Sequence, residues 1–348
     1  MKERQAQKNK IINVYQSNFI QEIKNISDNI KQFPYIGMDT EFPGTLYSPD
    51  LTSYQAIKQN VDNLKLIQVG ITLSDKQGNK PLTGGIWQFN LKFSLKSDKY
   101  AKDSINMLSN CGIDFEQLEQ NGIEHEQFAE YLLSSGLVLN DELKWVCFHG
   151  IYDFAYLLKT LTNLPLPDNE KDFFTDLSMY FPTFYDIRYL IRYNDNLKGS
   201  LTRLAQELNV KRFGIQHQAG SDSLITLEVF LKLFVDDIIT ADNAIKDKNA
   251  LFGISPTEPA NSDSEYNQFM TNFGIGQGSN EEHNDVNSYS PNLYSNSIYE
   301  YNQNYYGNNP YQYIRGNNNN YYYPYQMMNR KEESKDNFGK RKWNRGEE

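Results

Sequence analysis

The chain has 348 residues, of which 39% are hydrophobic, which is enough for one large domain with a sizeable core or for a domain with an appendage. Its formal net charge of −10 argues against a protein that binds nucleic acid through a general basic surface, so any such contact should be local. The two cysteines, Cys111 and Cys147, lie in no metal-ligand spacing, which excludes a disulfide framework and a cysteine zinc site.

The amino-terminal part of the chain predicts a flexible start, a helix and a strand. Residues 1–10 are rich in Lys, Arg and Gln, and no apolar stretch long enough for a signal peptide or a membrane span follows them. We therefore expect a soluble intracellular protein without membrane contact. Apolar residues recur at helical spacing within Val14–Ile30, and the apolar run Ile36–Phe42 is expected to be the first strand.

The middle of the chain alternates between strand and helix patterns. Leu64–Leu73 and Gly85–Phe93 predict a hairpin beside the first strand, because both are rich in β-forming residues and a polar turn separates them. The further predicted helices are Ser104–Leu108, Glu126–Ser134, Gly199–Leu208 and Ser221–Ile239, and the further predicted strands are Lys144–Phe148 and Phe184–Asp186. This order indicates an α/β domain over residues 11–254, with a central mixed sheet of five to six strands flanked by helices.

The composition changes sharply after this domain. Residues 255–348 are dominated by Asn, Tyr, Ser, Gly and Gln, and such a segment buries too little aliphatic surface to offset its chain entropy, so we expect it to be disordered. It can be an inert extension, or it can self-associate or stack its tyrosines on RNA bases. The short basic run Lys340–Lys342 is either a nuclear-targeting signal or simply solvated.

Acidic residues in the first strand indicate a metal site. A strand alternates its side chains, so Asp39 and Glu41 project to the same face, and two carboxylates in one small volume repel each other unless a cation neutralises them. Asp39 also follows an apolar run, where an unpaired charge is costly. With Asp153 and Asp222 the chain offers an all-oxygen ligand set that suits two ions of Mg²⁺ or Mn²⁺.

These residues can be divided between two ion sites. Asp39 would bridge both ions, Glu41 and Asp222 would complete one site, and Asp153 would complete the other, as in two-metal phosphodiester hydrolysis. His217 can take a proton from the attacking water, because imidazole titrates near neutral pH. Taken alone, an aspartate such as Asp153 is more often a helix cap than a metal ligand, and a histidine such as His217 is more often a hydrogen-bonded surface residue.

The position of His217 follows from helix geometry. Five residues turn an ideal helix through about 500°, so His217 and Asp222 cannot share one helical face. We therefore expect His217 in the loop before the helix, with Gly220 permitting the bend.

Several motifs together resemble a known enzyme family, the CAF-type (POP-type) deadenylases, which are catalytic subunits of the CCR-NOT complex. Similarity extends over about residues 11–253. The motifs that carry it are Met38-Asp39-Thr40-Glu41-Phe42-Pro43-Gly44, Ile67-Gln68-Val69-Gly70, Trp87-Gln88-Phe89-Asn90, Phe148-His149-Gly150-Ile151-Tyr152-Asp153-Phe154 and His217-Gln218-Ala219-Gly220-Ser221-Asp222-Ser223.

The resemblance implies an RNase H-like fold of the DEDD exonuclease superfamily, in the subgroup with a histidine in its late motif. It implies that Asp39, Glu41, Asp153 and Asp222 bind the metals and that His217 is the general base. The family removes poly(A) from the 3′ end of messenger RNA one nucleotide at a time and releases AMP. Its members dock on a large scaffold subunit beside a second deadenylase of unrelated fold, so we expect these partners and a location in cytoplasm and nucleus.

Three further residues are candidates for binding the substrate. Phe42 can pack on the terminal ribose or base, or can belong to the core. His149 can support the site near Asp153 or be structural, and Lys198 can meet a phosphate or be an ordinary exposed lysine. Two other functions stay open: an interaction module that bridges subunits without hydrolysis, and an exonuclease that acts on DNA or on very short oligoribonucleotides.

Overall fold

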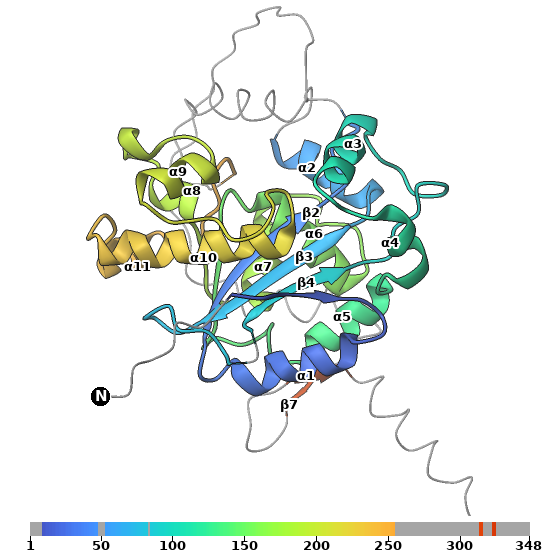
Figure 1. Cartoon of the computed structure of the whole chain (residues 1–348), viewed down its shortest axis with the longest axis horizontal. Coiled ribbons are helices and arrows are strands. Elements are labelled where there is room, and N and C mark those ends of the chain that lie inside the picture. Colours follow the sequence, from blue (N-terminus) through green and yellow to red (C-terminus); the bar gives the residue numbers. More distant parts are fainter. Residues whose placement is uncertain (1–8, 48–52, 83, 255–312, 316–321, 325–348) are drawn as a thin grey trace, which may run out of the picture. The chain divides into compact units, whose positions relative to one another are not determined.

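The computed structural model describes residues 9–47, 53–82 and 84–254, together with the short segments 313–315 and 322–324 (Figure 1). Most of the predicted flexible start and of the predicted disordered tail lies outside the described residues. Within residues 255–348, β7 (Tyr313–Arg315) and β8 (Tyr322–Pro324) form an antiparallel pair that was not predicted from the sequence.

A mixed sheet of six strands forms the centre of the domain. The strands are β1 (Ile11–Val14), β2 (Tyr35–Glu41), β3 (Gln68–Ser74), β4 (Ile86–Asn90), β5 (Lys144–Cys147) and β6 (Phe184–Asp186), in the spatial order β1-β4-β3-β2-β5-β6. β3 runs antiparallel to both of its neighbours, and the other pairs are parallel. The prediction of a mixed sheet of five to six strands is confirmed.

Helices cover both faces of this sheet. They are α1 (Phe19–Asn29), α2 (Ser53–Asn63), α3 (Lys102–Asn110), α4 (Phe115–Asn121), α5 (His125–Ser134), α6 (Ile151–Thr162), α7 (Glu170–Tyr180), α8 (Ile187–Leu190), the 3₁₀ turn η1 (Asp195–Leu197), α9 (Leu201–Glu207), α10 (Ala219–Val235) and α11 (Ala241–Lys246). No helix among the described residues combines the length and the apolar character that crossing a bilayer needs.

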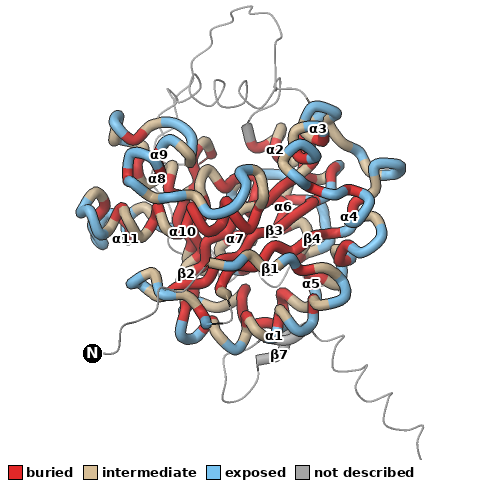
Figure 2. Tube along the Cα trace, in the orientation of Figure 1, coloured by how far each residue is buried: buried red, intermediate tan, exposed pale blue. Residues whose placement is uncertain are grey.

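Three apolar cores form among the described residues, and the smallest includes residues of α3 and α4. The other two lie on opposite faces of the sheet. One joins the sheet to α1, α2, α5, α6 and α7, and the other joins it to α9, α10 and α11. Figure 2 shows the strands buried between these layers. In β2, Ile36 and Met38 belong to the first core, so the alternation of the strand turns Gly37, Asp39 and Glu41 toward the face that α10 covers.

The amino-terminal prediction was wrong in one respect. Residues 11–14 form the edge strand β1 beside β4, and the helix begins only at Phe19 instead of at Val14. β1 has only four residues, too few for a strand pattern to stand out beside the helical periodicity that follows it. The helices α2, α4, α7, α8 and α11 were also not predicted. The hairpin, β5, β6, α3, α5, α9 and α10 were predicted with boundaries shifted by a few residues.

The close approach of α10 to β2 depends on Gly37. A Cβ atom at this position would lie 2.3 Å from the carbonyl oxygen of Ser223 and 2.7 Å from Cβ of Leu227. We therefore expect Gly37→Ala to lower the free energy of unfolding by about 1–3 kcal/mol, because the helix has to move away from the sheet. Chemical denaturation measures this change, and an unaltered midpoint and slope would contradict the contact.

Candidate active site

A cavity of about 210 Å³ opens where β2 ends, between α10, α6 and the segment before α10. Its lining includes Asp39, Glu41, Asp153, His217 and Asp222, five residues that come from widely separated parts of the chain. The structure therefore brings together all the residues that were predicted to be catalytic. Phe42 and His149 also line this cavity, but Lys198 does not.

Asp39 and Glu41 lie in the last part of β2. Burial raises the pKa of Asp39 well above its usual value, and Asp222, Asp153 and Glu41 raise it further, while Arg212 lowers it. Burial also raises the pKa of Glu41, followed by the charges of Asp222 and Asp153. The physical reason is the same for both, since ionised carboxylates are crowded into a volume with little water.

Asp153 is the third residue of α6, and Gly150 occupies the N-cap position of this helix. One oxygen of Asp153 accepts hydrogen bonds from the backbone N–H of Thr40 at 2.8 Å and from the Thr40 hydroxyl at 2.6 Å. Burial raises the pKa of Asp153 to about 7, although these two hydrogen bonds oppose the shift. Asp153 thus joins α6 to the acidic strand, and it does not act as the N-cap of its own helix.

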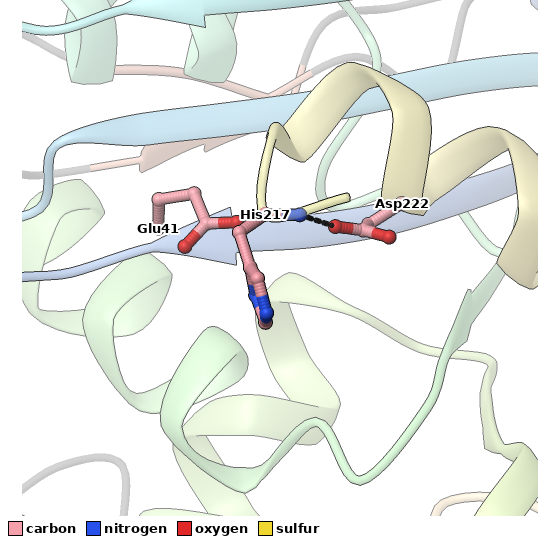
Figure 3. A group of neighbouring side chains, drawn as sticks. All are labelled: Glu41, His217 and Asp222. Atoms are coloured by element: carbon pink, nitrogen blue, oxygen red, sulfur yellow. Dashed lines mark hydrogen bonds between the residues drawn. The ribbon is translucent and has the colours of Figure 1, made fainter. Parts of the chain in front are cut away.

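His217 and Asp222 are held next to each other at the start of α10. The backbone N–H of His217 donates to Oδ2 of Asp222 at 2.8 Å, which fixes the loop against the helix. Figure 3 shows both side chains grouped with Glu41, and one ligand atom from each of the three lies within 4.8 Å of the others. His217 precedes the helix as predicted.

Gly220 was wrongly predicted to permit the bend. The left-handed conformation belongs to His217 itself, with φ 61°, whereas Gly220 is the second residue of α10. The absence of a side chain at Gly220 serves packing instead, because a Cβ there would lie 2.8 Å from Ile11 and 3.1 Å from Gln88.

Arg212 also lines the cavity, and it was not predicted from the sequence. Its guanidinium forms an ion pair with Asp222 and donates to the hydroxyl of Ser221 at 3.1 Å. This positive charge partly offsets the acidic cluster. A signal was present in the sequence, because Lys211–Arg212 is a basic pair just before the acidic motif, but no periodic pattern marks it.

The three candidates for substrate binding have different surroundings. The ring of Phe42 stacks against Tyr152 and Tyr156, with centroids 5.2 and 5.1 Å away, so it packs on the core and also faces the cavity. Burial, followed by the charge of Arg188, lowers the pKa of His149 to about 3, which keeps its imidazole neutral. Nζ of Lys198 lies 2.9 Å from Oδ1 of Asp195.

The chemistry of this site fits divalent cations. Four carboxylates and an imidazole converge, and the ligand atoms are mainly oxygens, which suits Mg²⁺ and Mn²⁺ better than softer metals. Burial raises the pKa of Asp39, Glu41 and Asp153, and the neighbouring carboxylates raise those of Asp39 and Glu41 further, so the ionised cluster is costly to hold without a bound cation. Two ions would remove this cost.

Known proteins similar to this chain include ribonucleases, in agreement with the chemistry of the site. The model of the CAF1 family ribonuclease matches residues 14–134 and 130–230, which cover more than half of the chain. The chain belongs to this family. The resemblance drawn from the motifs is thereby confirmed. The α/β fold class is confirmed as well, because solved structures of CAF1-type proteins match this domain with TM-scores of 0.66 and 0.63.

Three matches to CAF1-type proteins illustrate this membership. The "Poly(A) ribonuclease pop2" of Schizosaccharomyces pombe is 44% identical over 230 residues, which cover 64% of this chain and 69% of that protein. A structure of S. pombe Pop2p in an Mg²⁺- and Mn²⁺-bound form has a TM-score of 0.66 at 41% identity and covers 70% of this chain and 99% of that one. A yeast CAF1 co-crystallised with the NOT1 MIF4G domain has a TM-score of 0.63 at 34% identity, covering 70% and 96%.

Proposed function

We propose that this protein is a poly(A)-specific 3′-to-5′ exoribonuclease that shortens the poly(A) tails of messenger RNA and releases AMP. The observation that carries the proposal is the convergence of Asp39, Glu41, Asp153, His217 and Asp222 in one cavity of a CAF1-family chain. The name of the S. pombe relative, a poly(A) ribonuclease, supports the substrate class. The metals bound in the Pop2p structure support Mg²⁺ and Mn²⁺ as cofactors.

Asp39, Glu41, Asp153 and Asp222 would hold the two ions in this proposal. Such ions supply charge that stabilises the attacking and leaving oxygens of a phosphodiester. Thr40 keeps one oxygen of Asp153 in a fixed orientation through its two hydrogen bonds, so the other oxygen would be free to bind an ion. Arg212 adds a positive charge beside Asp222 in the lining of the cavity, and this charge would attract a phosphate.

His217 would act as the general base. Its imidazole lies beside the carboxylates of Glu41 and Asp222, and it can accept the proton of a water molecule that attacks the last phosphodiester. The oxygen of that water would form a new bond to phosphorus, the bond from phosphorus to the 3′ oxygen of the penultimate nucleotide would break, and that oxygen would take up a proton to leave as a 3′-hydroxyl. The products are AMP and an RNA shorter by one residue. Phe42, His149 and Lys198 stay proposals for substrate binding.

The proposal extends to the partners and the location of the protein. The yeast CAF1 structure with the NOT1 MIF4G domain supports docking on a scaffold subunit of the CCR-NOT complex. A second deadenylase of unrelated fold on the same scaffold, and a location in cytoplasm and nucleus, rest on the family resemblance. The division into residues 1–10, an exonuclease domain over 11–254 and a tail over 255–348 is part of the same proposal.

A substrate panel tests this function. RNAs with a 5′ label and 3′ tails of A, C, G or U are incubated with the protein and Mg²⁺ or Mn²⁺, beside a DNA oligonucleotide and a dinucleotide. We expect stepwise shortening of the A tail with release of AMP, and none with EDTA or with Glu41→Gln prepared in parallel. Equal activity on DNA or on the dinucleotide would indicate a different exonuclease. Binding of a NOT1 MIF4G domain without any hydrolysis would indicate an interaction module.

A further inference from the structure

Five amide side chains form a cluster directly behind the proposed active site. They come from β1, β3, β4 and the residue before α10, and they are Asn13, Gln68, Gln88, Asn90 and Gln218. None of them lines the cavity. Gln68, Gln88 and Asn90 are at most 5% exposed. Buried amides are costly unless their donors and acceptors are paired, so the pairing of this cluster indicates its role.

The cluster caps the amino-terminal end of α10. Gln218 occupies the N-cap position of this helix, but its side chain makes no capping hydrogen bond. Instead, the side-chain oxygen of Gln88 accepts from the backbone N–H of Gly220 at 3.0 Å, and that of Gln68 accepts from the N–H of Ala219 at 3.4 Å. Orphan N–H groups in the first turn of a helix need such acceptors, and here strands β4 and β3 supply them.

The remaining atoms of these amides connect the cluster internally. The side-chain oxygen of Gln218 accepts from Nε2 of Gln88 at 2.7 Å, and its amide nitrogen donates to the carbonyl of Cys111 at 2.8 Å. Nε2 of Gln88 also donates to Asn13 at 3.0 Å, and Nε2 of Gln68 donates to Asn90 at 2.8 Å. Gln88 therefore uses both its acceptor and its donor, which a carboxylate or an apolar side chain cannot do.

The backbone of β3 packs directly against the first turn of α10. A Cβ atom at Gly70 of β3 would lie 1.8 Å from the carbonyl oxygen of Ala219, so the strand and the first turn of α10 are in direct contact. His217 comes immediately before Gln218, and Asp222 is the fourth residue of the helix. A movement of this helix end would displace both residues relative to Asp39 and Glu41.

We propose that the amide network of Asn13, Gln68, Gln88, Asn90 and Gln218 is a positioning device that fixes the first turn of α10 on the sheet and so places Asp222 and His217 opposite Asp39 and Glu41. The effect of this network on the rate of RNA hydrolysis rests on the proposed function, whereas its effect on the position of the first turn of α10 does not. Gln88 is the central positioning residue, because it contacts both Gly220 and Gln218. Displacements of about 1 Å in such a site lower catalysis strongly.

Gln88→Met tests this proposal, because methionine is of similar size but can neither cap Gly220 nor donate to Gln218. The matched control is Thr72→Val, which removes a buried hydrogen bond between β3 and the same helix, where the hydroxyls of Thr72 and Ser223 lie 2.9 Å apart. Each variant loses a buried polar contact between the sheet and α10. Only Gln88→Met removes an acceptor that caps the N-terminus of this helix, near Asp222.

Three measurements on the full chain separate positioning from general stability. We expect Gln88→Met to accelerate hydrogen exchange of the amides of residues 218–222, to weaken Mn²⁺ binding in calorimetry by about 10- to 100-fold, and to lower kcat by a similar factor with KM changed less than about two-fold. Thr72→Val should lower thermal stability without changing the hydrogen exchange of residues 218–222 or the affinity for Mn²⁺. Equal effects of both variants, or normal Mn²⁺ affinity and normal exchange in Gln88→Met, would overturn the proposal.

A second variant covers the case in which Gln88→Met does not fold. Gln218→Met keeps the acceptors that cap α10 but removes the link to Gln88 and to Cys111, and we expect a smaller change of the same kind. Where both single variants fold, the double variant should be hardly worse than Gln88→Met, because the two residues belong to one network. Fully additive losses would refute a shared network. If the wild-type protein hydrolyses no RNA, the exchange and calorimetry results still decide this proposal, whereas the proposed function fails.

Discussion

Asp39→Asn is expected to lower the rate of poly(A) shortening by about 10³-fold, and at the same time to stabilise the metal-free protein. The rate falls because an amide is a poor ligand for a hard cation, and the loss of one preorganised charged group at a transition state costs this much or more. The stability rises because one of four crowded carboxylates becomes neutral, and burial, followed by the charges of the other three, raises the pKa of this carboxylate. Single-turnover assays on labelled RNA measure the rate, and denaturation in EDTA measures the stability.

The opposite signs of these two effects distinguish a metal ligand from a structural residue. Asp62→Asn is a suitable control, because Asp62 accepts from Lys58 at 2.9 Å and from the N–H of Leu166 at 2.8 Å, away from the cavity. It should lose stability and keep its rate. An Asp39→Asn protein that is both inactive and less stable in EDTA would argue that Asp39 mainly supports the fold.

The metal-free protein should lose stability as the pH rises from about 5 to 8. The pKa of Asp153 is raised to about 7, and those of Asp39 and Glu41 are raised as well, so the folded state binds protons more tightly than the unfolded state. For groups with a raised folded-state pKa, the stabilising contribution is complete below the ordinary value and disappears as the pH passes the raised one. Thermal unfolding in EDTA across this range measures the slope.

Adding Mn²⁺ should reverse this trend. At a concentration of about 100 times its dissociation constant, a ligand that binds only the folded state adds about 2.7 kcal/mol, which corresponds to roughly 5–10 °C in a domain of this size. The gain should be larger at pH 8 than at pH 6, because the ions compete with protons for the same oxygens. Asp153→Asn should flatten the slope in EDTA and reduce the gain. Parallel curves with and without Mn²⁺ would contradict a site built from these carboxylates.

Local rules predicted much of this site. The alternation of β2 was enough to place Asp39 and Glu41 on one face, and helix geometry was enough to place His217 before α10. Asp153 could be placed near a helix start, but its hydrogen bonds from Thr40 join residues 113 positions apart, which no local pattern reports.

The missed features depend on long-range contacts. Arg212 gains its role only because it meets Asp222 in space, and a basic pair in a loop is more often simply solvated. Gly220 was predicted to permit a bend because glycine often does so. In the structure, a side chain is excluded there because Ile11 and Gln88, from strands distant in the sequence, pack against this position. The edge strand β1 is only four residues long and becomes recognisable through its pairing with β4.

The order of the site residues along the chain has a consequence for protein synthesis. Asp39 and Glu41 belong to an early strand, whereas Asp222 belongs to the last long helix of the domain and His217 lies just before that helix. A growing polypeptide therefore acquires the complete set only when nearly all of the domain has left the ribosome. A nascent nuclease tethered beside the message that encodes it is thus unable to cut RNA. Truncated translation products that stop before α10 would be equally harmless.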